Sequence, residues 1–150
     1  MQSIDYSGLD KLDMRFAKVL DELPDMRRDM HSAVALGLQQ AVRINIAASG
    51  VNDSGGKVGG WQERHVGSGG GYAAVRPIPG GQRGNNPGAI TNYLESGHKT
   101  RASKAARRGR PRQANARAYG FYARTRAQAQ DIALGAANRF ADEAAERLGD

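Results

Sequence analysis

Apolar residues recur at three- and four-residue spacing near the N-terminus, which is typical of a helix buried along one face. The repeating positions are Leu9, Leu12, Phe16, Val19, Leu20 and Leu23. Ser7 can accept a hydrogen bond from the free N–H groups of the first turn, and Pro24 ends the pattern. The sequence therefore predicts a short amphipathic helix between these two residues.

A second helix is predicted from Pro24 to about Ser49. Proline fits the first turn of a helix because its missing N–H has no partner there anyway, and the carboxylate of Asp25 favours the positive end of the helix dipole. Gly50 follows as a suitable C-terminal cap. The apolar stripe of this helix consists of Met30, Val34, Leu38, Ala41, Val42 and Ile46.

A third helical pattern begins at Phe121 and Tyr122 and continues toward the C-terminus. Its apolar stripe consists of Ala129, Ile132, Ala133, Ala136, Phe140, Ala144 and Leu148. Because so many of these positions are alanine, another helix can approach this one closely.

Glycine clusters divide the middle of the chain into short segments. Val58 to Val66 and Tyr72 to Ile78 are too short for helices and are predicted as strands, joined by a hairpin turn at the SGGG sequence. Trp61 and Tyr72 would then form a cross-strand pair packed against the helices. The segment Ala89 to Glu95 fits either a third strand or the start of a helix.

These elements predict one α+β domain over residues 1–150, with N-terminal helices, a small antiparallel sheet, a long basic loop or arm, and a C-terminal helix. The basic arm covers about residues 96–118. It has almost no large apolar residue, so burial within its own subunit cannot offset the entropy lost on ordering.

Charge is distributed unevenly along the chain. Lysine and arginine outnumber aspartate and glutamate by 22 to 15, and no acidic residue occurs from Ser96 to Gln130. The first thirty residues, in contrast, contain the carboxylates of Asp5, Asp10, Asp13, Asp21, Glu22, Asp25 and Asp29. An acidic end and a basic middle favour head-to-tail contacts between copies of the chain.

The basic arm has two interpretations: it docks on acidic faces of neighbouring subunits, or it binds nucleic acid through phosphate charges. No aromatic residue lies between His98 and Tyr119, so the stacking platform of a single-strand binder is missing. We therefore prefer protein docking and keep nucleic-acid binding as the alternative. The residues expected to contact a subunit or partner are Arg107, Arg108, Arg110 and Arg112 in the arm, with Glu95 and His98 at its root.

The sequence predicts no catalytic, cofactor or metal site. Cysteine is absent, which excludes disulfides and thiolate metal sites. His31, His65 and His98 are each alone in their segments, and the glycines before Tyr72 lack the GK[ST] sequence of a phosphate-binding loop. No serine lies in a nucleophile-elbow pattern. Because no long apolar run occurs, we expect a soluble protein made in the cytoplasm.

Three blocks in register resemble the tail-component family from the head–tail morphogenesis clusters of long-tailed bacteriophages. The blocks are the glycine-rich strand pair at Gly60 to Pro77, the NYLESGH sequence at Asn92 to His98, and the aromatic-led, alanine-rich helix at Gly120 to Leu148. The loop from Lys99 to Tyr119 departs from the family pattern, because it is richer in arginine.

This resemblance implies a structural virion protein of the phage neck, without enzymatic activity or cofactors, that acts in head–tail joining or tail completion. By analogy it would form a homo-oligomeric ring, a hexamer, after synthesis in the host cytoplasm. The implied partners are copies of the chain itself, the head connector or adaptor, and the tail terminator or tail tube. DNA in the channel is a further potential contact, and no membrane is involved.

Overall fold

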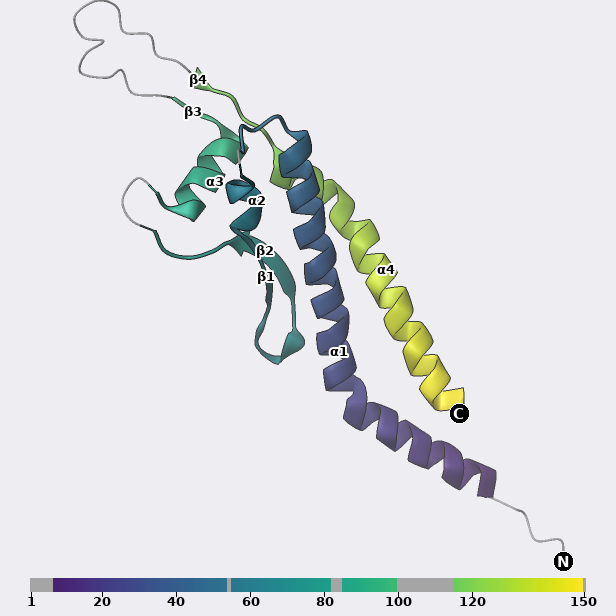
Figure 1. Cartoon of the computed structure of the whole chain (residues 1–150). Coiled ribbons are helices and arrows are strands. Elements are labelled where there is room, and N and C mark those ends of the chain that lie inside the picture. Colours follow the sequence, from purple (N-terminus) through teal and green to yellow (C-terminus); the bar gives the residue numbers. More distant parts are fainter. Residues whose placement is uncertain (1–6, 54, 82–84, 100–114, 150) are drawn as a thin grey trace, which may run out of the picture.

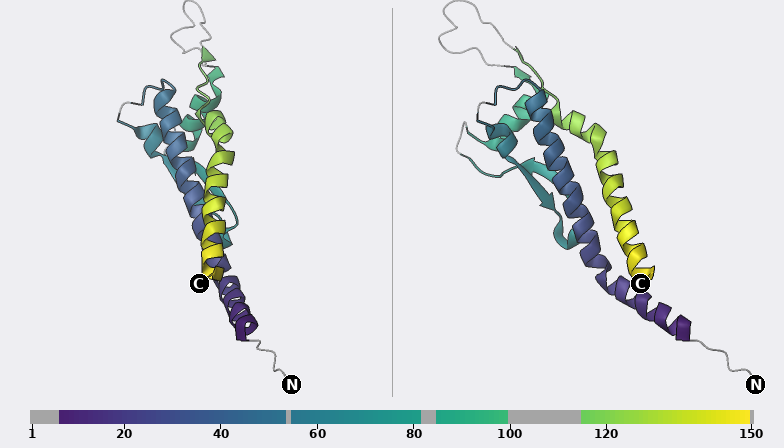
Figure 2. Two further views of the ribbon diagram at one scale, coloured as in Figure 1. Left: turned by 90° about the vertical axis from the view of Figure 1, so that its right-hand side faces the viewer. Right: turned by 45° about the vertical axis from the view of Figure 1, so that its right-hand side comes forward.

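The computed structural model describes residues 7–53, 55–81, 85–99 and 115–149. Two long helices, α1 (Ser7–Ala48) and α4 (Phe121–Gly149), lie side by side and give the molecule its elongated shape (Figures 1 and 2). A small α/β unit packs against the C-terminal half of α1. It consists of α2 (Lys57–Gly60), β1 (Gln62–Val66), the 3₁₀ turn η1 (Ser68–Gly70), β2 (Ala73–Pro77), α3 (Pro87–Ser96), β3 (His98–Lys99) and β4 (Asn115–Ala116). The α+β prediction is confirmed.

The two predicted N-terminal helices form one continuous helix, so the predicted break at Pro24 is wrong. A proline inside a helix removes one hydrogen bond and clashes with the carbonyl four residues earlier, which costs about 3 kcal/mol and usually bends the helix. Figure 1 shows such a bend partway along α1. Val19 and Met26, on either side of the proline, are both buried. The apolar stripe therefore continues across Pro24, and its burial keeps the two segments in one helix.

The predicted hairpin is present, but its first strand is shorter than expected. β1 and β2 pair antiparallel, with Gln62 opposite Pro77 and Val66 opposite Ala73. Residues 57–60 form the helical turn α2, because the carboxylate of Asp53 accepts hydrogen bonds from the N–H groups of Val58 and Gly59 at 2.9 and 3.1 Å.

The expected pair of Trp61 and Tyr72 is wrong. Trp61 precedes β1, and its carbonyl oxygen accepts a hydrogen bond from the N–H of Ile78 at 2.8 Å. Tyr72 lies at the other end of the hairpin, where its ring stacks at a tilt on His65 with centroids 5.8 Å apart. Trp61 instead packs against the core.

Residues 87–96 form a helix, which decides between the two alternatives for the segment Ala89 to Glu95. Pro87 occupies the first turn of α3, and the side chain of Asn86 accepts a hydrogen bond from the N–H of Ala89 at 3.1 Å. Both features are typical of helix starts.

The core is small and lies where α1, α2 and α4 meet. Val42, Ile46, Val58 and Phe121 form its buried centre. Partly buried side chains surround it, namely Val51, Trp61, Val75, Leu94, Tyr119 and Tyr122. Farther along, α1 and α4 pack mainly on each other, and a Cβ atom on Gly37 would lie only 2.7 Å from Ile132. The close helix approach expected from the alanine-rich stripe is therefore present.

Candidate interaction surfaces

The root of the basic arm is a two-residue ladder at one end of the molecule. His98 pairs with Ala116 and Lys99 with Asn115. Gly97 turns the chain out of α3 with a φ of +70°, and a Cβ atom there would lie 2.7 Å from the carbonyl oxygen of Ala116. The two ends of the arm thus leave the body of the protein side by side (Figure 1). The predicted contact residues Arg107, Arg108, Arg110 and Arg112 lie outside the described residues.

Glu95 holds the start of α4. Its carboxylate oxygens accept hydrogen bonds from the N–H groups of Tyr122 at 2.9 Å and Ala123 at 3.0 Å. Its own carbonyl accepts the N–H of Gly120 at 3.2 Å. The first N–H groups of a helix have no partner inside the helix, and a carboxylate there is also favoured by the helix dipole. Glu95 therefore links the end of α3 to the start of α4, beside the arm.

Loss of this carboxylate should weaken the fold. Glu95→Ala is expected to lower the free energy of unfolding by about 0.5–2 kcal/mol, the usual cost of removing a helix cap. Glu146→Ala is the matched control, because Glu146 is exposed near the other end of α4. Urea denaturation followed by circular dichroism measures both. Equal stability of the two variants would show that the Glu95 hydrogen bonds contribute nothing.

His98 lies at the surface of the arm root. Its ring stacks at a tilt on Tyr93, with centroids 4.8 Å apart. On the opposite strand end, the guanidinium of Arg117 lies 5.7 Å from the ring centre of Tyr119. Together with Lys99, these side chains make the arm root basic and aromatic. Glu95 and His98 are thus both at the root of the arm, and their contact with another subunit remains a prediction.

A buried polar network centred on Gln62 joins the helices to the hairpin, and it was not predicted from the sequence. The Gln62 side chain is 1% exposed. Its amide nitrogen donates to the carbonyl of Val58 at 2.8 Å, and its amide oxygen accepts from the hydroxyl of Tyr122. The Gln62 backbone carbonyl also accepts from the side chain of Gln39 at 2.7 Å. Gln62 therefore links β1 to the three helices α1, α2 and α4.

The Tyr122 hydroxyl gives this network a pH dependence. Burial, and secondarily the charge of Glu95, raises the pKa of Tyr122 from 10.0 to about 12. Folding therefore favours the neutral phenol, so this contribution to stability is complete below pH 10 and is lost as the pH rises toward 12. The thermal midpoint of the wild type should fall more steeply between pH 9.5 and about 11.5 than that of Tyr122→Phe. If the thermal midpoints of both proteins fall equally with pH, Tyr122 is not the source of the pH dependence.

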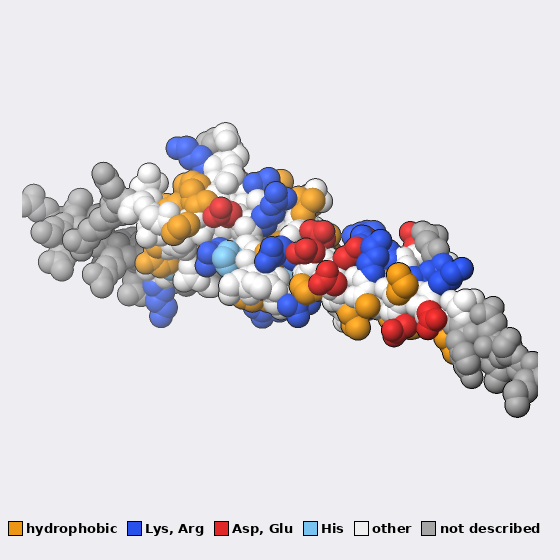
Figure 3. Space-filling view, turned by 90° about the horizontal axis from the view of Figure 1, so that it is seen from below, with side chains coloured by type: hydrophobic (Ala, Val, Ile, Leu, Met, Phe, Trp, Pro, Cys, Tyr) orange, Lys and Arg blue, Asp and Glu red, His pale blue; other side chains and the backbone are white. Residues whose placement is uncertain are grey.

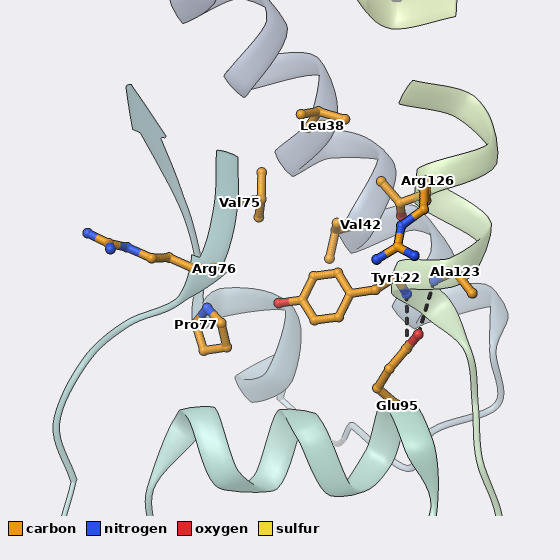
Figure 4. A pocket seen from close by; sticks show the side chains of 10 residues that line it. Leu38, Val42, Val75, Arg76, Pro77, Glu95, Tyr122, Ala123 and Arg126 are labelled. Atoms are coloured by element: carbon orange, nitrogen blue, oxygen red, sulfur yellow. Dashed lines mark hydrogen bonds between the residues drawn. The ribbon is translucent and has the colours of Figure 1, made fainter. Parts of the chain in front are cut away.

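A groove opens beside Tyr122, between α1, β2 and the start of α4 (Figure 4). We call it the Tyr122 groove; its volume is about 540 Å³. Residues that line it include Leu38, Val42, Val75, Pro77, Tyr122 and Arg126. Figure 4 shows Arg126 beside Tyr122, whereas Arg76 points away from the groove. The groove thus has apolar walls, with the cationic side chain of Arg126 and the carboxylate of Glu95 at its edge.

The N-terminal turns of α1 expose an apolar stripe. Leu9, Leu12, Phe16 and Leu20 share one face of the helix and are 62%, 41%, 47% and 64% exposed. We call this set the N-terminal stripe. α4 accompanies α1 only as far as Arg15, whose guanidinium donates to the carbonyls of Leu148 and Gly149 at 3.4 Å. The predicted amphipathic helix is therefore present, but much of its apolar face is not covered by the described residues.

The two ends of the molecule differ in charge. In Figure 3, Asp and Glu side chains gather over the half that includes the N-terminal end, while Lys and Arg occur over both halves. Near the N-terminal end, Glu22 and Glu143 both form salt bridges with Arg147. The acidic side chains of the N-terminal half are thus visible on this face, whereas most of the predicted basic arm lies outside the described residues.

Within the described ranges, no group of three His, Asp or Glu side chains could hold a metal ion. None of the described helices has a stretch long and apolar enough to cross a membrane. Comparison of the chain with protein-family models, with curated proteins and with solved structures yields no match.

Proposed function

We propose that the chain is a structural subunit of a phage neck, which assembles with copies of itself into a ring at the junction of head and tail. The observation that carries this proposal is the exposed N-terminal stripe. Leu9 and Leu20 are more than 60% exposed on a helix that extends beyond its partner. A contiguous apolar patch of this kind is typical of protein interaction sites. The subunit therefore has a surface that association would cover.

Two further features support a structural role. The buried core is small, and much of the described chain lies in two long helices, which is a shape suited to contacts with several neighbours. The sequence blocks at Gly60 to Pro77, Asn92 to His98 and Gly120 to Leu148 also resemble those of phage tail components. In this role the partners are the head connector or adaptor on one side and the tail terminator or tail tube on the other.

Negative-stain electron microscopy of the purified protein tests the proposal. Closed rings of uniform diameter, with a central channel, are expected at micromolar concentration. Open filaments would show that subunits associate without closing a ring. Single small particles at every concentration would contradict self-assembly.

The arm provides a second test. Substitution of Arg107, Arg108, Arg110 and Arg112 by alanine is expected to reduce the ring population several-fold without loss of helical circular dichroism. The reason is that the arm should be ordered by burial against an acidic neighbour rather than within its own subunit. If the helical signal is lost instead, the arm belongs to the core of the domain.

The lack of any acidic residue from Ser96 to Gln130 favours one alternative function, nucleic-acid binding through the arm. Fluorescence anisotropy with a duplex DNA at several salt concentrations separates the two functions. Nanomolar to micromolar affinity that falls steeply with salt favours nucleic-acid binding, because released counterions drive such contacts. Weak binding that does not saturate favours the structural subunit.

A further inference from the structure

We propose that the N-terminal stripe of one copy docks in the Tyr122 groove of the next copy. This inference rests on the proposed ring and names the two surfaces that would hold it together. Every copy has both surfaces, and the contact joins the stripe of one copy to the groove of its neighbour, head to tail.

The stripe continues an interface that the protein already uses. Within one chain, the same face of α1 carries the buried residues Val19 and Met26, and α4 lies beside this part of the helix. Leu12 and Phe16 are the preceding positions on that face, at the same three- and four-residue spacing. A second apolar surface placed against them would extend the existing helix contact by two turns.

The groove has the form and chemistry to receive such side chains. Its volume of about 540 Å³ falls within the range of roughly 300–1,000 Å³ seen for pockets that enclose ligands. Leu38 and Val42 provide one apolar wall, and Val75 and Pro77 provide the other (Figure 4). An amphipathic helix commonly binds by placing apolar side chains three and four residues apart into a groove of this kind.

The charges beside the two surfaces are complementary. Asp10 and Asp13 lie on the same turns of α1 as the stripe. Arg126 lies at the edge of the groove. Arg64 is directly opposite Val75 in the hairpin, so its side chain leaves the sheet on the groove side. The carboxylate of Glu95 also lines the groove, but it already accepts the N–H groups of Tyr122 and Ala123. Lys11 lies between the two aspartates on the incoming helix. The pairing of Asp10 and Asp13 with Arg126 and Arg64 still favours this orientation over pairing of two stripes, which would place the aspartates of both copies together.

The two surfaces are too far apart to meet within one chain. Leu38, which lines the groove, lies on the same helix as Leu12 and 26 residues after it. At 1.5 Å per residue the separation along α1 is about 39 Å. The stripe can therefore reach the groove only in another copy. Each copy then offers one stripe and one groove, and such head-to-tail contacts form a ring when the rotation between copies closes.

Cysteine cross-linking tests the contact, because the chain has no cysteine of its own. The test variant carries Leu12→Cys in the stripe and Ala123→Cys at the exposed edge of the groove. The matched control carries Leu12→Cys with Ala133→Cys, since Ala133 is an exposed alanine on α4 that does not line the groove. Both variants and the three single-cysteine variants are treated with a short bismaleimide and separated on a denaturing gel.

The expected result is a ladder of covalent multimers from the Leu12→Cys/Ala123→Cys variant, with at least fivefold less product from the control pair and from each single variant. Covalent dimers from Leu12→Cys alone would overturn the inference in favour of stripe-to-stripe pairing. Equal products from the test and control pairs would overturn it as well. In both cases, multimers of the untreated protein in light scattering would leave the proposed ring intact, whereas a single-copy mass would contradict both.

Discussion

Substitution of Phe121 by alanine is expected to lower the free energy of unfolding by about 3–5 kcal/mol. The Phe121 side chain is 0% exposed and lies at the centre of the core, beside Val42, Ile46 and Val58. Alanine would leave a cavity where α1, α2 and α4 meet. Since domains of this size are stable by only about 5–15 kcal/mol, much of the protein should unfold at 37 °C.

Leu134→Ala is the control for this experiment, because Leu134 lies on the same helix and is 52% exposed. It should change stability by less than about 0.5 kcal/mol, as most surface substitutions do. Urea denaturation at 25 °C, followed by circular dichroism, gives both values. A loss below about 1 kcal/mol for Phe121→Ala would mean that the observed core does not hold the fold together.

The double substitution Leu12→Asp/Phe16→Asp is expected to convert the assembled protein into single copies. Full burial of an exposed side chain of this size contributes about 1.5–3 kcal/mol. Roughly half of Leu12 and of Phe16 remains exposed, so their loss weakens the contact by about 1.5–3 kcal/mol in total. This difference corresponds to roughly a tenfold to hundredfold change in the dissociation constant. The fold should remain, because both side chains are more than 40% exposed.

Met14→Asp is the matched control for the stripe. Met14 lies between the same turns, is 72% exposed and points away from the stripe by helix periodicity. Analytical ultracentrifugation measures the association of both variants. If Met14→Asp weakens assembly as much as the double substitution does, the effect comes from added charge and the stripe is not the contact.

The helices could be predicted because apolar spacing is a local property of the sequence. The spacing predicts α4 from Phe121 onward and places apolar residues along both halves of α1. Whether the helix continues through Pro24 is not decided by local sequence. It depends on the burial of Val19 and Met26 on either side, which arises only when the helices pack together. A rule that proline ends a helix therefore gave the wrong number of helices.

The polar contacts could not be predicted, because they join residues far apart in the chain. Glu95 caps a helix that starts 26 residues later, and Gln62 bonds to Tyr122. One signal was available for the first of these contacts. Tyr119 and Gly120, which precede α4, have no side chain that can cap a helix, so the free N–H groups needed a partner from elsewhere.

The N-terminal stripe was predicted as a helix face, but its exposure was not. Periodicity shows which residues share a face and does not show what covers them. α4 reaches Arg15, so Leu9 and Leu12 lie beyond its end. Phe16 and Leu20 lie beside α4 along the helix but are still 47% and 64% exposed. The proposed assembly is based on this exposure of an apolar helix face in the single chain.

The mass of the purified protein in solution tests the central claim most directly. Light scattering coupled to size exclusion, over a series of protein concentrations, measures this mass. The proposed ring predicts one discrete multiple of the 16.0 kDa chain, constant above a threshold concentration. A mass of 16.0 kDa at every concentration would contradict it.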